Sequence, residues 1–292
     1  MAVVTPSLLT SLMTGFKANY QAGVSMAESD YGKIATTVPS SSKSNTYGWL
    51  GQFPQFREWA GDRVINDISA SGYEITNKDY ESTIGVKRTD IEDDNLGIYS
   101  PLFTEMGRAA TAHPDELVFS LLAAGFATNC YDGQYFFDTD HAVGTGSVSN
   151  IQAGTETPWY LLDTSRAIKP LVFQERKKAE FVSMTKSDDE NVFTANQYRY
   201  GVDSRCNVGY GFWQMAFGSK AALTGANFND AFSSMASFKS DEGRPLGIKP
   251  SILIVPPTLR AAALEIINAE TIGGTSNTNR GAVDVVVSPW LA

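Results

Sequence analysis

Apolar residues recur at helical spacing near the start of the chain and again near residue 100. The first stretch follows Thr5 and Pro6, which form a typical helix start, and carries apolar side chains on one face through Phe16. The second stretch begins at Ser100, a good N-cap, and is predicted to run as a long helix over residues 100–128. Pro114 falls inside it and is expected to interrupt or kink the helix.

Alternation of apolar and polar positions predicts a β-hairpin between these two helices. Its predicted residues are Tyr73 and Ile75 on one arm, Asn77, Lys78 and Asp79 in the turn, and Ile84, Val86, Lys87 and Arg88 on the other arm. Few of these side chains are bulky and apolar, and an isolated two-stranded ribbon is only marginally stable. We therefore expect the ribbon to project and to find its partner on another subunit.

The second half of the chain mixes both patterns. Short apolar runs at 171–174, 181–184 and 198–202 predict strands separated by charged turns. The last third reads as a helix over 227–238, a buried strand, a helix opened by Pro256 and Pro257, and a second apolar strand over 283–287. Together these patterns predict an α+β protein whose end is a small α/β layer.

Composition limits the classes of function. The chain has 292 residues, of which 42% are hydrophobic and 19% charged, so it can bury a large core. A net charge of −9 argues against binding nucleic acid through phosphate contacts as the main task. No apolar run approaches the length of a membrane helix, so no membrane contact is expected. Two cysteines are too few for a disulfide framework and are interpreted as reduced thiols.

The search for reactive groups finds little. The segment 138–141, with Asp138, Asp140 and His141 close to Cys130, is the one cluster with ligand chemistry, but no second histidine or cysteine lies nearby in sequence. No nucleophile elbow is present. We therefore expect no enzyme activity, no cofactor and no catalytic or metal site. A hydrolase using the 138–141 loop, with or without a divalent metal, remains an alternative.

Two short charged runs have two possible roles. Arg176, Lys177 and Lys178 form a basic run, and Asp188, Asp189 and Glu190 form an acidic one. Such runs are usually solvated faces, but they can also be complementary contacts between subunits. After its first helix the N-terminal segment loosens into a polar run over residues 40–46, which is typical of an arm. Together with this arm and the projecting ribbon, the charged runs favour a protein that assembles, because unpaired edges invite association.

Several blocks carry a family resemblance. They are residues 44–51, 92–99, 114–117, 130–134 with 136–138, 173–176 and 209–216. In order and spacing these blocks resemble the major head (capsid) subunit of Mu-like tailed phages, the gpT family. They extend over nearly the whole chain, and the chain departs from the family pattern mainly in the loop after His141 and at the extreme C-terminus.

The resemblance implies the Hong-Kong-97-type capsid fold. It would divide the chain into an N-terminal arm (1–45), an extended-loop region with the hairpin (46–98), a peripheral domain with its spine helix (99–217) and an axial domain (218–292). It implies hexamers and pentamers of the chain in an icosahedral head around double-stranded DNA, with a scaffold, a portal and decoration proteins as further partners. The protein would be made in the host cytoplasm and end in the virion. An encapsulin-like compartment, which shares the fold, is the alternative.

Overall fold

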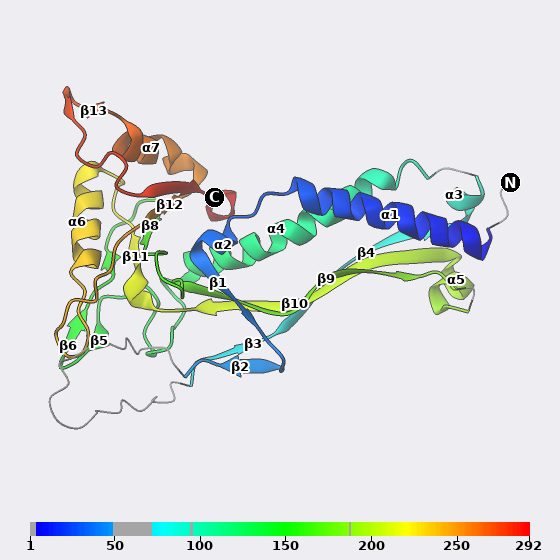
Figure 1. Cartoon of the computed structure of the whole chain (residues 1–292), viewed down its shortest axis with the longest axis horizontal. Coiled ribbons are helices and arrows are strands. Elements are labelled where there is room, and N and C mark those ends of the chain that lie inside the picture. Colours follow the sequence, from blue (N-terminus) through cyan, green and yellow to red (C-terminus); the bar gives the residue numbers. More distant parts are fainter. Residues whose placement is uncertain (1–3, 49–71, 94–95, 187) are drawn as a thin grey trace.

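The chain forms an elongated molecule with a different sheet at each end (Figure 1). This computed structural model describes residues 4–48, 72–93, 96–186 and 188–292. At one end, helices α1 (Pro6–Met26) and α4 (Ser100–Ala124) lie over a long, narrow sheet. At the other end, α6 (Gly225–Ala236) and α7 (Arg260–Asn268) lie beside a second sheet.

Helix α4 is the predicted spine, with two differences. Tyr99, not Ser100, is its N-cap residue, and no side chain caps it. Pro114 lies inside the helix without ending it, so the predicted interruption is wrong. A proline in a helix interior only removes one backbone donor and crowds the preceding turn, and packing of Phe103, Val118 and Phe119 on the sheet offsets that cost.

Helices α1 and α4 cross at two glycines. The space where Gly23 would carry a Cβ is occupied by the carbonyl of Thr104, and that of Gly107 by the carbonyl of Tyr20. The crossing brings aromatic rings into contact on the sheet side, where Phe16 stacks on Phe103 with ring centroids 4.3 Å apart. The helices therefore touch backbone to backbone.

The N-terminal segment is tied to its own chain, although the sequence predicts a loose arm. Thr5 caps α1 by accepting a hydrogen bond from the Leu8 amide, as expected. After α1, the buried carboxylate of Asp115 in α4 accepts hydrogen bonds from the Ser29 hydroxyl and from the amides of Asp30 and Tyr31. The chain then forms α2 (Tyr31–Ile34) and strand β1 (Ala35–Pro39).

The long sheet has the strand order β1-β9-β10-β4. Strands β9 (Leu171–Met184) and β10 (Gln197–Tyr210) are antiparallel, and β1 runs parallel to the start of β9. The two runs predicted at 171–174 and 181–184 are thus one strand. Helix α5 (Glu190–Ala195) joins β9 to β10 at the tip of the molecule.

The predicted hairpin does not form. Strand β3 (Glu74–Thr76) pairs with β2 (Ser44–Thr46), whereas β4 (Lys78–Lys87) pairs along its whole length with β10. Asn77 lies between β3 and β4 and is buried. The chain therefore does not turn at Asn77: it stays extended and passes from pairing with β2 to pairing with β10. Strand β4 is thus paired within its own chain and not with another subunit.

The second sheet has the order β15-β12-β8-β11-β7. Its strands are β7 (Ile151–Gln152), β8 (Trp159–Leu162), β11 (Ala216–Ser219), β12 (Ile252–Val255) and β15 (Asp284–Val287). All four residues of β8 and of β12 are buried. Because β7 and β8 precede residue 218, the sheet draws on both sides of the boundary predicted there.

The remaining elements are short. They are α3 (Arg88–Glu92), β5 (His141–Val143), β6 (Gly146–Val148), β13 (Thr271–Ile272), β14 (Thr275–Ser276) and three 3-10 turns at Trp213–Met215, Pro257–Leu259 and Pro289–Leu291. Strands β5 and β6 form a hairpin, as do β13 and β14.

Candidate assembly surfaces

The predicted ribbon residues divide into buried and exposed groups. Ile75, Asn77 and Val86 are buried within their own chain, so their side chains are not available to a neighbour. Tyr73 and Ile84 are partly buried. Four predicted contact residues are exposed along β4 and at its end: Lys78, Asp79, Lys87 and Arg88. Arg88 bonds Glu92 through Nε at 3.0 Å, and Arg205 on β10 pairs with Asp79 at 3.2 Å.

Asn77, the residue between β3 and β4, is fixed by hydrogen bonds of its side chain. Its side-chain amide donates to the Ser40 hydroxyl and to the Ser42 carbonyl, both at 3.0 Å. Its side-chain oxygen accepts from the buried Gln174 amide at 2.8 Å. Gln174 also donates to the Ile75 carbonyl. Each of these bonds joins segments far apart in sequence, so the residue type that indicated a turn acts as a tertiary anchor.

The basic run lies on β9, and two of its three residues, Arg176 and Lys177, bond within their own chain. Lys177 Nζ contacts Asp203 on β10 at 2.5 Å and Glu180 at 3.6 Å, and the hydrogen bond to Asp203 raises the pKa of Lys177. Arg176 donates to the Ser40 carbonyl at 3.2 Å. Asp203 stands opposite Glu180 on one side and Glu81 on the other. The lysine therefore offsets a row of carboxylates that would otherwise repel one another.

The acidic run lies at the tip, where it begins α5. Asp189 is the N-cap residue of α5, and its carboxylate accepts from the Lys186 amide at 2.8 Å. Asp188 and Glu190 are exposed. Lys177 pairs with Asp203 and Glu180 and not with this acidic run. The structure therefore gives no ion pair between Lys177 and the acidic run within one chain.

His141 pairs with Asp132 and not with Asp138 or Asp140, the carboxylates beside it in sequence. His141 Nδ1 lies 2.6 Å from Asp132 Oδ2, and the Cys130 thiol donates to Asp132 Oδ1 at 3.0 Å. Burial alone would raise the pKa of Asp132, but the hydrogen bonds from His141 and Cys130 outweigh it and lower the pKa. The His141 ring stacks on Trp213 with centroids 4.0 Å apart.

These three side chains could offer ligand atoms to a metal, since the atoms lie within 4.8 Å of one another. The environment of His141 argues against it. A metal-bound imidazole normally donates its second N–H to a partner, whereas the buried His141 Nε2 finds none within the described residues. A neutral ring that donates from Nδ1 to Asp132 needs no second donor bond. The cluster is best explained as a set of structural hydrogen bonds that joins the two ends of the 130–141 loop.

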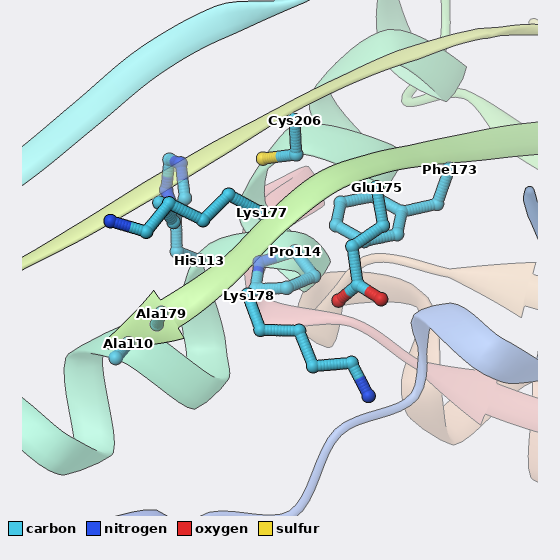
Figure 2. Close-up of a pocket in the computed structure, with 10 residues that line it drawn as sticks. Ala110, His113, Pro114, Phe173, Glu175, Lys177, Lys178, Ala179 and Cys206 are labelled. Carbon is cyan, nitrogen blue, oxygen red and sulfur yellow. The ribbon is translucent and has the colours of Figure 1, made fainter. Parts of the chain in front are cut away.

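A small cavity of about 90 Å³ separates α4 from the long sheet at Pro114 (Figure 2). Because proline has no N–H, the carbonyl of Ala110 cannot accept the regular helical bond from residue 114. His113 and Cys206 also line the cavity, and burial raises the pKa of the Cys206 thiol to about 11. A thiol held protonated in so small a space is not a nucleophile at neutral pH.

The tip of the molecule has a larger groove, of about 880 Å³, between α1 and α5. Its apolar lining includes Leu9 and Met13 of α1 and Tyr198 of β10, and charged side chains such as Lys186 and Asp188 also line it. Phe193 of α5 also lines the groove and is almost fully exposed. The sequence analysis missed this feature, because the six residues of α5 are too few for a periodic signal.

Comparison with known proteins identifies the family of the chain that carries these surfaces. The family model described as the Mu-like prophage major head subunit gpT matches residues 9–291. The chain belongs to the Mu-like gpT family of major head subunits. Members at similar identity are the major capsid protein of Escherichia phage Mu, 48% identical over 99% of this chain and all of the relative, and the Mu-like prophage FluMu major head subunit of Haemophilus influenzae, 49% identical over 92% of each.

Solved structures of phage capsids agree with this assignment. The procapsid of bacteriophage JBD30 matches with a TM-score of 0.87 and 55% identity, covering 98% of this chain and 100% of the other. The JBD30 capsid matches over both full chains with a TM-score of 0.82 and 40% identity. This gpT-family chain therefore has the Hong-Kong-97-type capsid fold expected from the sequence.

The family assignment settles three predictions. This gpT-family chain is the major capsid protein of a tailed phage and a component of the virion head. It is a structural subunit and not an enzyme, so the hydrolase alternative is rejected, and an encapsulin-like compartment is not favoured. Within the described residues, no helix is both long and apolar enough to cross a membrane.

Proposed function

We propose that this chain assembles into hexamers and pentamers that close an icosahedral head around double-stranded DNA. The observation that supports this proposal best is the match to the JBD30 procapsid over nearly the whole of both chains. The elongated shape is a second support, because a long, narrow subunit can touch several neighbours at once (Figure 1). Repeated interfaces whose geometry closes give shells without any single tight contact.

The predicted contact residues that are exposed and charged, on the long sheet and at the tip, would lie in contacts between subunits. These are Lys78, Asp79, Lys87 and Arg88 of the predicted ribbon, Arg176 and Lys178 of the basic run, and Asp188 and Glu190 of the acidic run. A basic stretch on β9 and an acidic stretch at the tip are complementary between copies, which steers association and fixes register.

Other partners follow from the same proposal. The JBD30 capsid is known in a form decorated with minor capsid protein trimers, and this chain would accept decoration proteins on its outer surface. A scaffold and a portal would guide assembly in the host cytoplasm. Contact with packaged DNA would be non-specific and weak, because a chain with a net charge of −9 gains little from counterion release.

The test is assembly of the purified chain, alone and with its phage's scaffold, followed by sedimentation and electron microscopy. Rings of six and five and closed shells are expected. A species that stays monomeric with and without scaffold would refute the proposal. Lys178→Glu should lower the yield of shells. If this variant gives the same yield as wild type at low and at high salt, the charge of Lys178 is not part of a contact.

A further inference from the structure

We propose that Phe193 of one subunit inserts into the tip groove of a second copy of the same chain. The tip groove is the cavity of about 880 Å³ between α1 and α5. This inference rests on the proposed function, because it assigns a contact within the shell that the chain builds. It identifies the aromatic anchor and the pocket that joins the tips.

Phe193 is presented as an anchor. Its side chain is 86% exposed, more than that of Met26, which follows it at 70% among the described large apolar side chains. The neighbouring positions Asn191 and Val192 are buried, so α5 turns only its outer face to solvent. Aromatic residues, phenylalanine among them, are enriched in protein interfaces relative to the rest of the surface.

The backbone beneath Phe193 is fixed. Asn191 donates through its side-chain amide to the carbonyls of Met184 and Gln197, which ties α5 to both long strands. Asn196 ends the helix in a left-handed conformation at φ 52°, and its amide bonds back to the Val192 carbonyl at 3.2 Å. Because this backbone is ordered before binding, the conformational freedom lost on binding is mainly that of the Phe193 side chain itself.

The groove is large enough to admit a phenyl ring and offers it apolar contacts. Its volume is within the range of ligand pockets in proteins, and its apolar lining includes Leu9, Met13 and Tyr198. A flexible methionine adapts to an inserted ring, and its sulfur makes favourable contacts with aromatic edges. Phe193 lines the groove of its own copy but remains 86% exposed, so it leaves the groove open to an inserted ring.

A second copy is the occupant that the surface favours. The anchor and the groove belong to one surface patch, so two or more copies can satisfy one another reciprocally and close a symmetric contact. The lining carries both signs of charge, with Arg88 and Lys186 beside Asp188, so each copy can offer a facing copy a charge opposite to its own. A shell also supplies further copies at high effective concentration.

Disulfide capture between two variants tests the contact. Phe193→Cys and Thr10→Cys, the latter placed in the groove lining, are mixed in equal amounts, assembled and oxidised. The native thiols Cys130 and Cys206 are buried and do not interfere. We expect at least tenfold more linked dimer than in a mixture of Thr10→Cys with Met26→Cys, a control at the other end of α1.

The other outcomes each count against the inference. Shells that form without the linked dimer would refute the tip contact and leave the proposed function standing. A dimer from Phe193→Cys alone would mean that the rings meet each other and not the groove. A link that forms only to a different capsid protein would assign the groove to that partner. If the wild-type chain forms no shell, the proposed function fails and the inference with it.

As a second measurement, Phe193→Ala should raise the protein concentration needed for assembly at least tenfold, whereas Phe193→Leu should recover most of the loss. The exposed site keeps the fold of both variants, which circular dichroism of the subunit checks. Equal assembly by Phe193→Ala and wild type would overturn the role of the ring.

Discussion

Gly107 offers the sharpest test of how α1 is held on the spine helix. An alanine Cβ at this position would lie 2.0 Å from the Tyr20 carbonyl oxygen and 2.9 Å from the Val24 nitrogen. The obstacle is backbone and not a flexible side chain, so the two helices must separate by about 1 Å before the methyl group fits. That separation also loosens the stacked pair Phe16 and Phe103.

The size of the effect follows from two opposing terms. Overpacking of this kind costs about 1–3 kcal/mol, and replacing glycine by alanine inside a helix returns up to about 1 kcal/mol. We expect Gly107→Ala to lower the free energy of unfolding by about 1–2 kcal/mol. The control is Gly15→Ala in α1, where nothing lies within 4 Å of the added Cβ. That variant should gain about 0.5–1 kcal/mol.

Thermal unfolding by circular dichroism measures the difference, with both variants and wild type in the same assembly state. At roughly 2 °C per kcal/mol for a chain of this size, Gly107→Ala should melt about 3–6 °C below Gly15→Ala. Hydrogen exchange should show lost protection along α1 in the first variant only. A Gly107→Ala protein that melts with or above the control would refute the close crossing of α1 and α4.

Three further predictions concern buried polar groups. Asp115→Ala should lower the free energy of unfolding by about 1–3 kcal/mol and release the turn after α1 to hydrogen exchange, because it leaves several donors unpaired; unchanged exchange would contradict this. Since the pKa of Asp132 is lowered from its ordinary 3.8, its bond to His141 stabilises the fold above that pH and the contribution is lost as the pH falls through the folded-state pKa. Asp132→Asn should therefore be less stable than wild type at pH 7, and urea titrations should show the gap closing below about pH 4; a gap that does not change with pH would refute the stabilising role of the Asp132 carboxylate. Burial raises the pKa of both Cys130 and Cys206, so a thiol reagent at pH 8 should label neither in the folded chain and both after denaturation; rapid labelling of the native protein would count against their burial.

Local signals in the sequence predicted the helices well and the strand partners poorly. The start of α1 at Thr5 and Pro6 and the start of the spine near Pro101 follow from residues within one turn, and the structure has both. The hairpin around Asn77 failed because its turn chemistry is local, whereas the bonds that Asn77 makes reach Ser40 and Gln174. No pattern within a short window carries that information.

The sequence was enough to predict that the chain assembles, but not which residues form its contacts. A shortage of reactive residues and the family blocks indicated a subunit of a shell, and the comparisons confirm it. The individual residues were harder, because alternation in β4 gave no hint that β10 would cover one of its edges. Phe193 drew no notice, since a single aromatic residue in a charged segment looks like any other until its exposure is known.

Strand β8 has a consequence for how the chain can be made. It lies in the middle of its sheet, with β11 on one side and β12 on the other, and all of its four residues are buried. During synthesis β8 leaves the ribosome some ninety residues before β12, so the backbone N–H and C=O groups of one edge stay unpaired until the chain is nearly complete. A polypeptide cut short before Ile252 cannot close that edge. Such truncated products would aggregate or be degraded, which keeps incomplete subunits out of a growing lattice.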